Sequence, residues 1–151
     1  MASALKIRLA DMANLESVAN LFDQYRQFYA QAPNIALATQ FIGDRIKNQQ
    51  SVILVAEIDQ KIHGFCQLYP TFCSVEAAPI MVLYDLFVAK TARKTGLGAA
   101  LMLAARAYAM EHHFVRLDLS TAKTNHAAQA LYESLGWQRD EEFYHYSLTA
   151  N

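Results

Sequence analysis

The chain has 151 residues, of which 54% are hydrophobic and 18% are charged, and its formal net charge at pH 7 is −1. These values exclude a disordered chain and argue against broad, charge-driven binding to nucleic acid. Since the sequence also contains neither a membrane-length apolar run nor a signal-peptide pattern, we expect a cytoplasmic protein that forms one domain over residues 1–151.

The first half of the chain predicts a strand, two helices and a β-hairpin. A half-buried strand alternates apolar and polar residues, and a helix repeats its apolar residues every three to four positions. A β-branched run followed by a polar turn and a second such run is typical of an antiparallel hairpin. On these patterns we expect strand 5–9, helices 15–29 and 37–46, and hairpin strands 51–57 and 62–72.

The second half is expected to continue the same layered α/β arrangement. Pro79 precedes a central strand, and a glycine-bearing turn leads from that strand into a long Ala/Leu/Met helix. Asn125 is expected to cap a short helix, which Gly136 ends in a left-handed conformation. The expected elements are strand 81–88, turn 93–98, a helix to residue 111, strand 114–119, the short helix and a last strand 143–148.

The turn Arg93-Lys94-Thr95-Gly96-Leu97-Gly98 joins a strand directly to a helix. This order aims several unpaired backbone N–H groups at one point, with the positive end of the helix dipole behind them. The glycines let the backbone approach a phosphate without a Cβ in the way, and the two basic side chains add charge. The turn therefore indicates either a phosphate site or a tight connection whose basic residues are solvated.

Two motifs together give the chain a resemblance to the GCN5-related N-acetyltransferase family. The turn 93–98 is similar to that family's phosphate loop, in which Arg or Gln precedes Gly and then Gly or Ala. The segment 125–137 is similar to its downstream motif, with Asn, Ala, a Leu-Tyr pair and a Gly-aromatic ending. The resemblance implies an α/β fold with a mixed, mostly antiparallel sheet, splayed at its central strands and flanked by helices on both faces.

The resemblance also implies that acetyl-coenzyme A binds as a co-substrate. In such proteins the loop amides hold the pyrophosphate, and backbone groups of the central strand pair with the pantetheine arm like an added strand. The cofactor-binding residues implied here are Phe87, Val88, Arg93, Lys94, Thr95, Gly96, Leu97, Gly98, Ala99, Asn125 and Tyr132.

The reaction implied is direct attack of a neutral amine on the thioester, which needs a base for the amine and an acid for the thiolate. The resemblance implies that Tyr132 is the acid that protonates the thiolate. The alternative is that Tyr132 is an ordinary packed residue. Asp85 is a candidate base, because a carboxylate in an apolar strand must be paired, exposed to a cleft or shifted in pKa. Its alternative role is a structural hydrogen-bond anchor. Glu57 is a second candidate base, acting through water.

Aromatic residues predict an acceptor pocket that suits a compact amine, with a carboxylate selecting for positive charge. Core packing is the alternative for those in the first helix. The expected substrate-binding residues are Tyr25, Tyr29, Tyr69, Phe72, Tyr84 and Asp85.

We therefore expect an acetyl-coenzyme A-dependent N-acetyltransferase that acts on a primary amine of a small molecule. The alternatives are acetylation of a protein N-terminus or lysine, and a non-catalytic acetyl-coenzyme A sensor. Because the last strands of such folds often pair across chains, we expect a homodimer. Cys66 and Cys73 lack the spacing of a zinc site, so we expect no metal and read both as small buried hydrophobes, with a nucleophilic thiol as the alternative.

Overall fold

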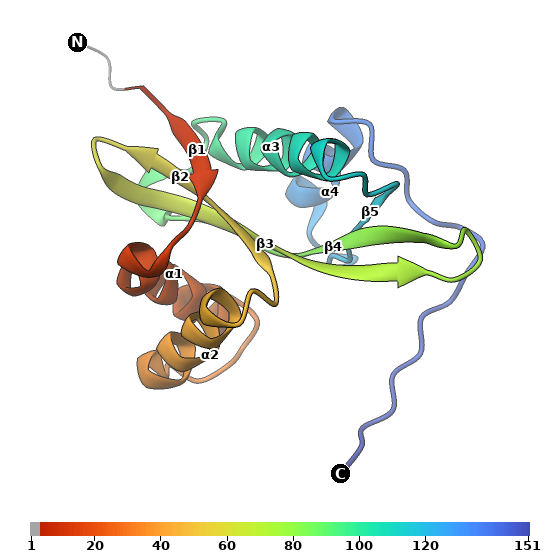
Figure 1. The fold of residues 1–151 in the computed structure, drawn as a ribbon, viewed down its shortest axis with the longest axis horizontal. Coiled ribbons are helices and arrows are strands. Elements are labelled where there is room, and N and C mark those ends of the chain that lie inside the picture. The colour runs from red at the N-terminus through yellow and green to blue at the C-terminus, as the bar shows by residue number, and fades with distance from the viewer. Residues whose placement is uncertain (1–3) are drawn as a thin grey trace. The chain divides into compact units, whose positions relative to one another are not determined.

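Figure 1 shows the computed structural model, which describes residues 4–151; residues 1–3 of the expected domain lie outside the described residues. The chain forms two compact units, the first reaching Ser120 and the second spanning Thr121–Asn151. The second unit holds helix α4 (His126–Ser134). The elements of the first unit are β1 (Lys6–Leu9), η1 (Met12–Asn14), α1 (Leu15–Phe28), α2 (Ile35–Lys47), β2 (Val52–Ile58), β3 (Lys61–Cys73), β4 (Ala78–Val88), η2 (Lys90–Ala92), α3 (Leu97–Glu111) and β5 (Leu117–Asp118).

The first unit is built on a five-stranded sheet with the order β1-β2-β3-β4-β5. Neighbours from β1 to β4 are antiparallel, and β4 and β5 are parallel, which confirms the expected mixed sheet. The ladder between β4 and β5 joins Met81 to Leu117 and Val82 to Asp118. Since β4 continues to Val88 after β5 has ended, the sheet opens beside the carboxyl half of β4.

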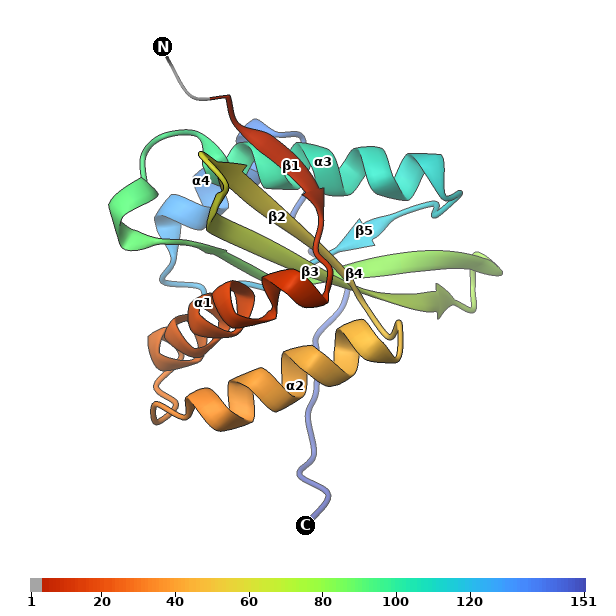
Figure 2. The ribbon, with the colours of Figure 1, turned by 60° about the vertical axis from the view of Figure 1, so that its left-hand side comes forward.

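Helices cover both faces of this sheet, as Figure 2 shows for α1 and α2 on one side and α3 on the other. Strand alternation explains the arrangement, because successive side chains point to opposite faces. Val55 and Phe65 join Phe22 and Ile42 in the core under α1 and α2. Cys66, the neighbour of Phe65, points to the other face, where its thiol lies 4.0 Å from the backbone oxygen of Leu101 in α3.

Local capping determines where the first helices begin. Asp11 accepts a 2.8 Å hydrogen bond from the Ala13 amide and forms a capping box with Asn14, so it starts the short η1 turn that precedes α1. Asn34 accepts from the Leu37 amide at 3.0 Å and starts α2 directly after the break at Pro33. Among the helices described for residues 4–151, none is long and apolar enough to cross a bilayer.

Three expected strands differ from the structure. The strand expected over 114–119 is limited to Leu117–Asp118, and β4 begins at Ala78, so Pro79 lies within it near the hairpin tip. Residues 143–148 form no described strand, and their aromatic side chains Phe143, Tyr144 and Tyr146 are exposed. Alternating apolar residues favour a strand, but the strand forms only where another strand supplies hydrogen-bond partners.

Candidate active site

A bulge in β4 forms the centre of the candidate site. Gln67 on β3 faces Asp85, and the next residue, Leu68, faces Leu83, so Tyr84 is the extra residue of β4. A bulge breaks the regular alternation of side chains, and bulges are frequent next to active sites. Tyr84 is 65% exposed, whereas Asp85 beside it is 3% exposed. The bulge therefore places a solvent-facing aromatic ring next to a buried carboxyl group.

Asp85 ends a chain of two hydrogen bonds that runs from Ser51, just before β2, through Gln67 of β3. The Gln67 side-chain amide donates to Asp85 Oδ2 at 2.6 Å. The Ser51 hydroxyl, next to the start of β2, donates to Gln67 Oε1 at 2.7 Å. Gln67 is completely buried. The sequence interpretation missed Ser51 and Gln67, although an amide side chain in the apolar run 64–69 was a usable signal, because a buried amide needs partners.

Tyr25 of α1 reaches the same carboxyl group from the other side. Its hydroxyl donates to the Tyr84 carbonyl oxygen at 3.0 Å and lies within reach of the Asp85 side chain. Burial raises the pKa of Tyr25, and the nearby Asp85 charge raises it further. Tyr25 therefore stays a neutral phenol that can donate and accept at the same time.

Burial also raises the pKa of Asp85 above the usual range of an aspartate, while its hydrogen bonds to Gln67 and Tyr25 act in the opposite direction. Burial raises the pKa of Tyr69 to about 12, and the Asp85 charge contributes in the same sense. On the opposite face of the sheet, burial raises the pKa of the Cys66 thiol to about 12. A thiol held protonated in this way is a poor nucleophile, so packing is the role that the structure supports for Cys66.

The four predicted pocket tyrosines form two pairs of rings, and the Asp85 charge acts on one member of each pair, Tyr25 and Tyr69. The rings of Tyr25 and Tyr29 lie 5.1 Å apart, and those of Tyr69 and Tyr84 lie 5.8 Å apart. Phe72 does not join them. It faces Pro79, near the far end of the β3–β4 hairpin, and is 77% exposed. The sequence interpretation grouped Phe72 with the others because it ignored how far an extended strand carries a side chain within a few residues.

The glycine turn between β4 and α3 has the local geometry of an anion site. Lys94 and Gly96 both adopt left-handed backbone conformations, with φ of 63° and 85°. The first turn of α3 follows directly, without a side-chain cap on its amides. A Cβ at Gly96 would meet nothing within 4 Å, so open space lies over the turn. These features fit the phosphate site that the sequence predicts, since unpaired helical N–H groups favour an anion.

Arg93 leans back against β4. Its Nε donates to the Val88 carbonyl oxygen at 3.1 Å, and its guanidinium carbon lies 5.2 Å from the centre of the Phe87 ring. These contacts tie together three of the residues expected to bind the coenzyme. They also place a permanent positive charge at the end of β4, beside the open edge of the sheet.

Asn125 and Tyr132 lie in the second unit. Asn125 Oδ1 accepts from the Ala128 amide at 3.2 Å, which confirms the predicted helix cap. At the other end of α4, the Trp137 and Gly136 amides donate to the carbonyl groups of Tyr132 and Glu133, and Gly136 has a φ of 93°. This is the hydrogen-bond pattern of a Schellman motif, and the rings of Tyr132 and Trp137, 6.3 Å apart, supply its apolar contact. Tyr132 thus has a packing role alongside the predicted chemical one.

Glu57, the second candidate base, is engaged elsewhere. Its carboxylate forms an ion pair with Arg8 at 3.1 Å, and this hydrogen-bonded partner lowers the pKa of Glu57. A carboxylate with a lowered pKa accepts a proton poorly. The structure therefore favours Asp85 over Glu57 as the proton acceptor.

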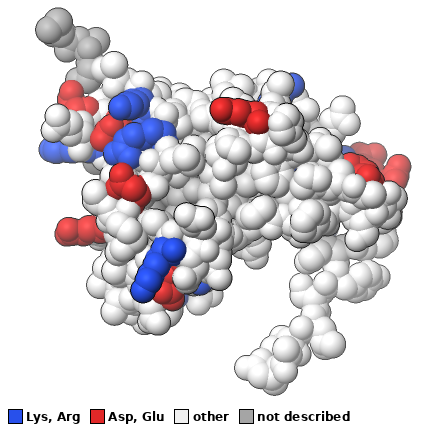
Figure 3. Space-filling model, in the orientation of Figure 1, with Lys and Arg blue, Asp and Glu red and all other residues white. Residues whose placement is uncertain are grey.

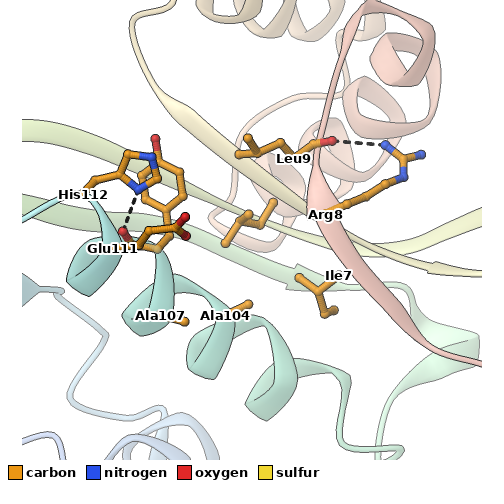
Figure 4. Close-up of a pocket in the computed structure, with 9 residues that line it drawn as sticks. Ile7, Arg8, Leu9, Ala104, Ala107, Glu111 and His112 are labelled. Carbon is orange, nitrogen blue, oxygen red and sulfur yellow. Dashed lines mark hydrogen bonds between the residues drawn. The ribbon is translucent and has the colours of Figure 1, made fainter.

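A shallow groove on the α3 face of the sheet contains none of the predicted site residues. Figure 4 shows it between β1 and α3, with Ile7 and Leu9 opposite Ala104 and Ala107. The imidazole of His112 at its end is already bonded through Nδ1 to the Tyr108 carbonyl oxygen at 2.9 Å. The groove combines these apolar side chains with the polar residues Arg8, Tyr108, Glu111 and His112.

Comparison with known proteins identifies the family. A model of the acetyltransferase (GNAT) family matches residues 15–137. The uncharacterised N-acetyltransferase YhfO of Bacillus subtilis is 43% identical over 144 residues, which cover 95% of this chain and 97% of that protein. The chain belongs to the GNAT acetyltransferase family.

Solved structures support the same assignment for the fold of this GNAT protein. The crystal structure of a probable acetyltransferase superposes with a TM-score of 0.90 at 36% identity, covering 97% of this chain and 98% of that one. An aminoglycoside N-acetyltransferase, AAC(6')-Iy in complex with CoA, superposes with a TM-score of 0.83 at 17% identity, covering 98% and 97%. The expected fold and the expected class, an N-acetyltransferase, are confirmed.

Proposed function

We propose that this GNAT protein transfers an acetyl group from acetyl-coenzyme A to a primary amine of a small molecule. The observation that carries the proposal is the position of two features on one strand. Asp85 and Tyr84 lie on β4, and the glycine turn follows that strand after the short η2 turn. At the usual rise of a strand, about 10 Å separate Asp85 from Val88, where the strand ends. Acceptor and coenzyme sites would then be neighbours.

The coenzyme would supply an acetyl group activated as a thioester. The amides from Lys94 to Ala99 would hold its pyrophosphate at the start of α3, supported by the charge of Arg93. Backbone groups of Phe87 and Val88 would pair with the pantetheine arm, because β4 has no neighbour on that side beyond the two pairs with β5 in the described chain. Asn125 and Tyr132 complete the proposed set, with Tyr132 as the acid for the thiolate.

The acceptor would bind between the aromatic rings. Tyr25, Tyr29, Tyr69 and Tyr84 offer ring faces and edges around one carboxyl group, which is an arrangement that selects a compact cation. The face in Figure 3 is mostly uncharged, and the basic atoms gathered over β1 and the β2–β3 turn alternate with acidic ones. With a formal net charge of −1, the chain offers no broad acidic field for a basic protein substrate, so a small molecule is favoured over a protein terminus or lysine.

A release assay for the coenzyme thiol tests the proposal. Wild-type protein and acetyl-coenzyme A would be incubated with amino acids, diamines, polyamines and aminoglycosides, and each acetylated product confirmed by mass spectrometry. Turnover on one class of these amines is expected. Turnover on peptides alone would favour a protein acceptor, and tight coenzyme binding without turnover on any acceptor would favour a sensor.

We further propose that the protein is a cytoplasmic homodimer. Exposed Tyr144, Tyr146 and Leu148 alternate in a segment without a strand partner in the described chain, which is the pattern of a strand that pairs with another copy. Both cysteines are free thiols, as in a reducing compartment. Light scattering at micromolar concentration should give twice the monomer mass, and a monomer alone would remove the dimer.

A further inference from the structure

Asp85 is too deeply buried to take a proton directly from a bound amine. Its exposed fraction is 3%, and its carboxyl oxygens face Gln67 and Tyr25 instead of solvent. Tyr25 is only half-buried, and its hydroxyl bonds the carbonyl of the exposed residue Tyr84. The Tyr25 hydroxyl therefore connects the buried carboxyl group with the backbone of the exposed residue Tyr84.

The Tyr25 hydroxyl has one proton and two acceptors within reach, the Tyr84 carbonyl oxygen and the Asp85 carboxyl group. When Asp85 is ionised, the proton of Tyr25 is drawn to the carboxylate, and the Tyr84 carbonyl is free to accept an N–H of the substrate. When Asp85 is protonated, it donates to Tyr25, whose proton then turns to the Tyr84 carbonyl. The two arrangements differ only in proton positions.

The hydrogen bond from Ser51 determines which end of the Gln67 amide faces the Asp85 carboxyl group. Its Oε1 accepts from Ser51, so the amide nitrogen is the end that points at Asp85. An N–H donor stabilises the ionised form of a carboxyl group, whereas an amide oxygen in the same place would repel it. Gln67 is completely buried, so its amide depends on these two protein partners.

We propose that Tyr25 relays the amine proton to Asp85, and that Gln67, oriented by Ser51, is the positioning residue that keeps Asp85 able to accept it. The inference rests on the proposed function. As the amine attacks, its N–H bond breaks while an O–H bond forms on Tyr25, and the proton of Tyr25 moves to the Asp85 carboxylate. The electron pair left on nitrogen stays in the new amide. The relay runs backwards to return the proton to solvent.

Other titratable groups around the carboxyl group do not lie on this path. Tyr29, which follows α1, and Tyr69 of β3 are phenols beside Tyr25 and Tyr84. The charge of Arg45 in α2 lowers the pKa of Tyr69, against the larger effect of burial. Cys66 points to the opposite face of the sheet, towards α3. Tyr84 itself contributes its backbone carbonyl. The hydrogen bonds thus single out Tyr25 as the relay.

The positioning role is tested without any substrate by following the Asp85 side-chain carboxyl carbon by NMR as a function of pH, with Asp85→Asn to assign the signal. Gln67→Met keeps the size of the side chain and removes the donor, and it should raise the pKa of Asp85 by about one to two units. Ser51→Ala frees the Gln67 amide to turn, so it should also raise the pKa of Asp85, but by less. An unchanged titration in Gln67→Met would overturn the positioning role.

The relay is tested by kinetics with acetyl-coenzyme A and the fastest amine of the release assay. Tyr25→Phe keeps the ring and should lower kcat about 100-fold while leaving the amine KM and the coenzyme Kd nearly unchanged. In Gln67→Met, the acidic limb of the kcat/KM profile should move up with the pKa of Asp85. Tyr108→Phe, which removes a hydroxyl on α3 in the groove beside β1, is the control and should keep wild-type kinetics.

The outcomes separate the relay from the function on which it rests. A Tyr25→Phe enzyme with wild-type kcat would overturn the relay and leave the acetyltransferase proposal intact. The relay would also be overturned if Gln67→Met shifts the NMR titration of Asp85 but leaves the pH profile of kcat/KM unchanged. Failure of the wild-type protein to acetylate any acceptor would instead overturn the proposed function, and the NMR titration would still decide the role of Gln67.

Discussion

Gln67 and Asp85 face each other across β3 and β4, joined by a 2.6 Å hydrogen bond that is shielded from solvent. A buried carboxylate loses its hydration, and one donated hydrogen bond restores only part of that loss. Asp85 therefore remains a group that is costly to ionise in the folded protein, and its pKa is raised for that reason. Such a cost is expected where the group serves chemistry instead of stability.

Asp85→Asn should make the protein more stable and less active. In wild type, the folded state keeps a proton on Asp85 at pH values where the unfolded chain has lost it, because burial raises the pKa. The free energy of unfolding thus falls as pH rises from about 4 through the raised pKa. The melting temperature of the variant should exceed that of wild type increasingly between pH 4 and pH 8, by about 2–4 °C for each kcal/mol recovered.

Glu16→Gln, in the exposed first turn of α1, is the control for this experiment and should show no such pH-dependent gain. If Asp85→Asn melts below wild type at every pH, Asp85 is a stabilising anchor and not a strained functional group.

Tyr132→Phe should slow turnover by about 10- to 100-fold while changing the coenzyme Kd little, since only the proton donor for the thiolate is removed. The ring that packs against Trp137 is retained, so the melting temperature should stay within about 1–2 °C. Stopped-flow measurement of thiol release alongside calorimetry separates the two effects. If Tyr132→Phe keeps the wild-type rate, Tyr132 is not the proton donor and only packs in the Schellman motif.

Tyr84→Ala and Phe72→Ala form a matched pair on one hairpin, because both remove an exposed aromatic ring. Tyr84 lies at the bulge beside Asp85, and its removal should raise the amine KM about tenfold by losing a ring contact to the cation. Phe72→Ala should leave the amine KM unchanged. An equal effect of the two substitutions would contradict the location of the acceptor pocket.

Much of the fold was predictable because local patterns matched the final structure. The alternation around Ile7, the hairpin turn at Asp59-Gln60 and the cap at Asn125 each specify their element through nearby residues. The arrangement of the candidate site was harder to predict from the sequence. The bulge at Tyr84 depends on the register between two strands, and the Ser51–Gln67–Asp85 bonds join residues far apart in the chain. Segment 143–148 was misjudged since its strand pattern lacks a partner strand.

Calorimetric titration with acetyl-coenzyme A, comparing Gly96→Val with Gly136→Val, tests the central claim most directly. Both glycines have positive φ and open space where a Cβ would lie, so both substitutions impose a similar backbone strain of about 1–2 kcal/mol. We expect wild type and Gly136→Val to bind the coenzyme, whereas Gly96→Val should bind at least about 100-fold more weakly because its side chain enters the phosphate site. Full affinity in Gly96→Val, or no binding by wild type, would contradict the claim.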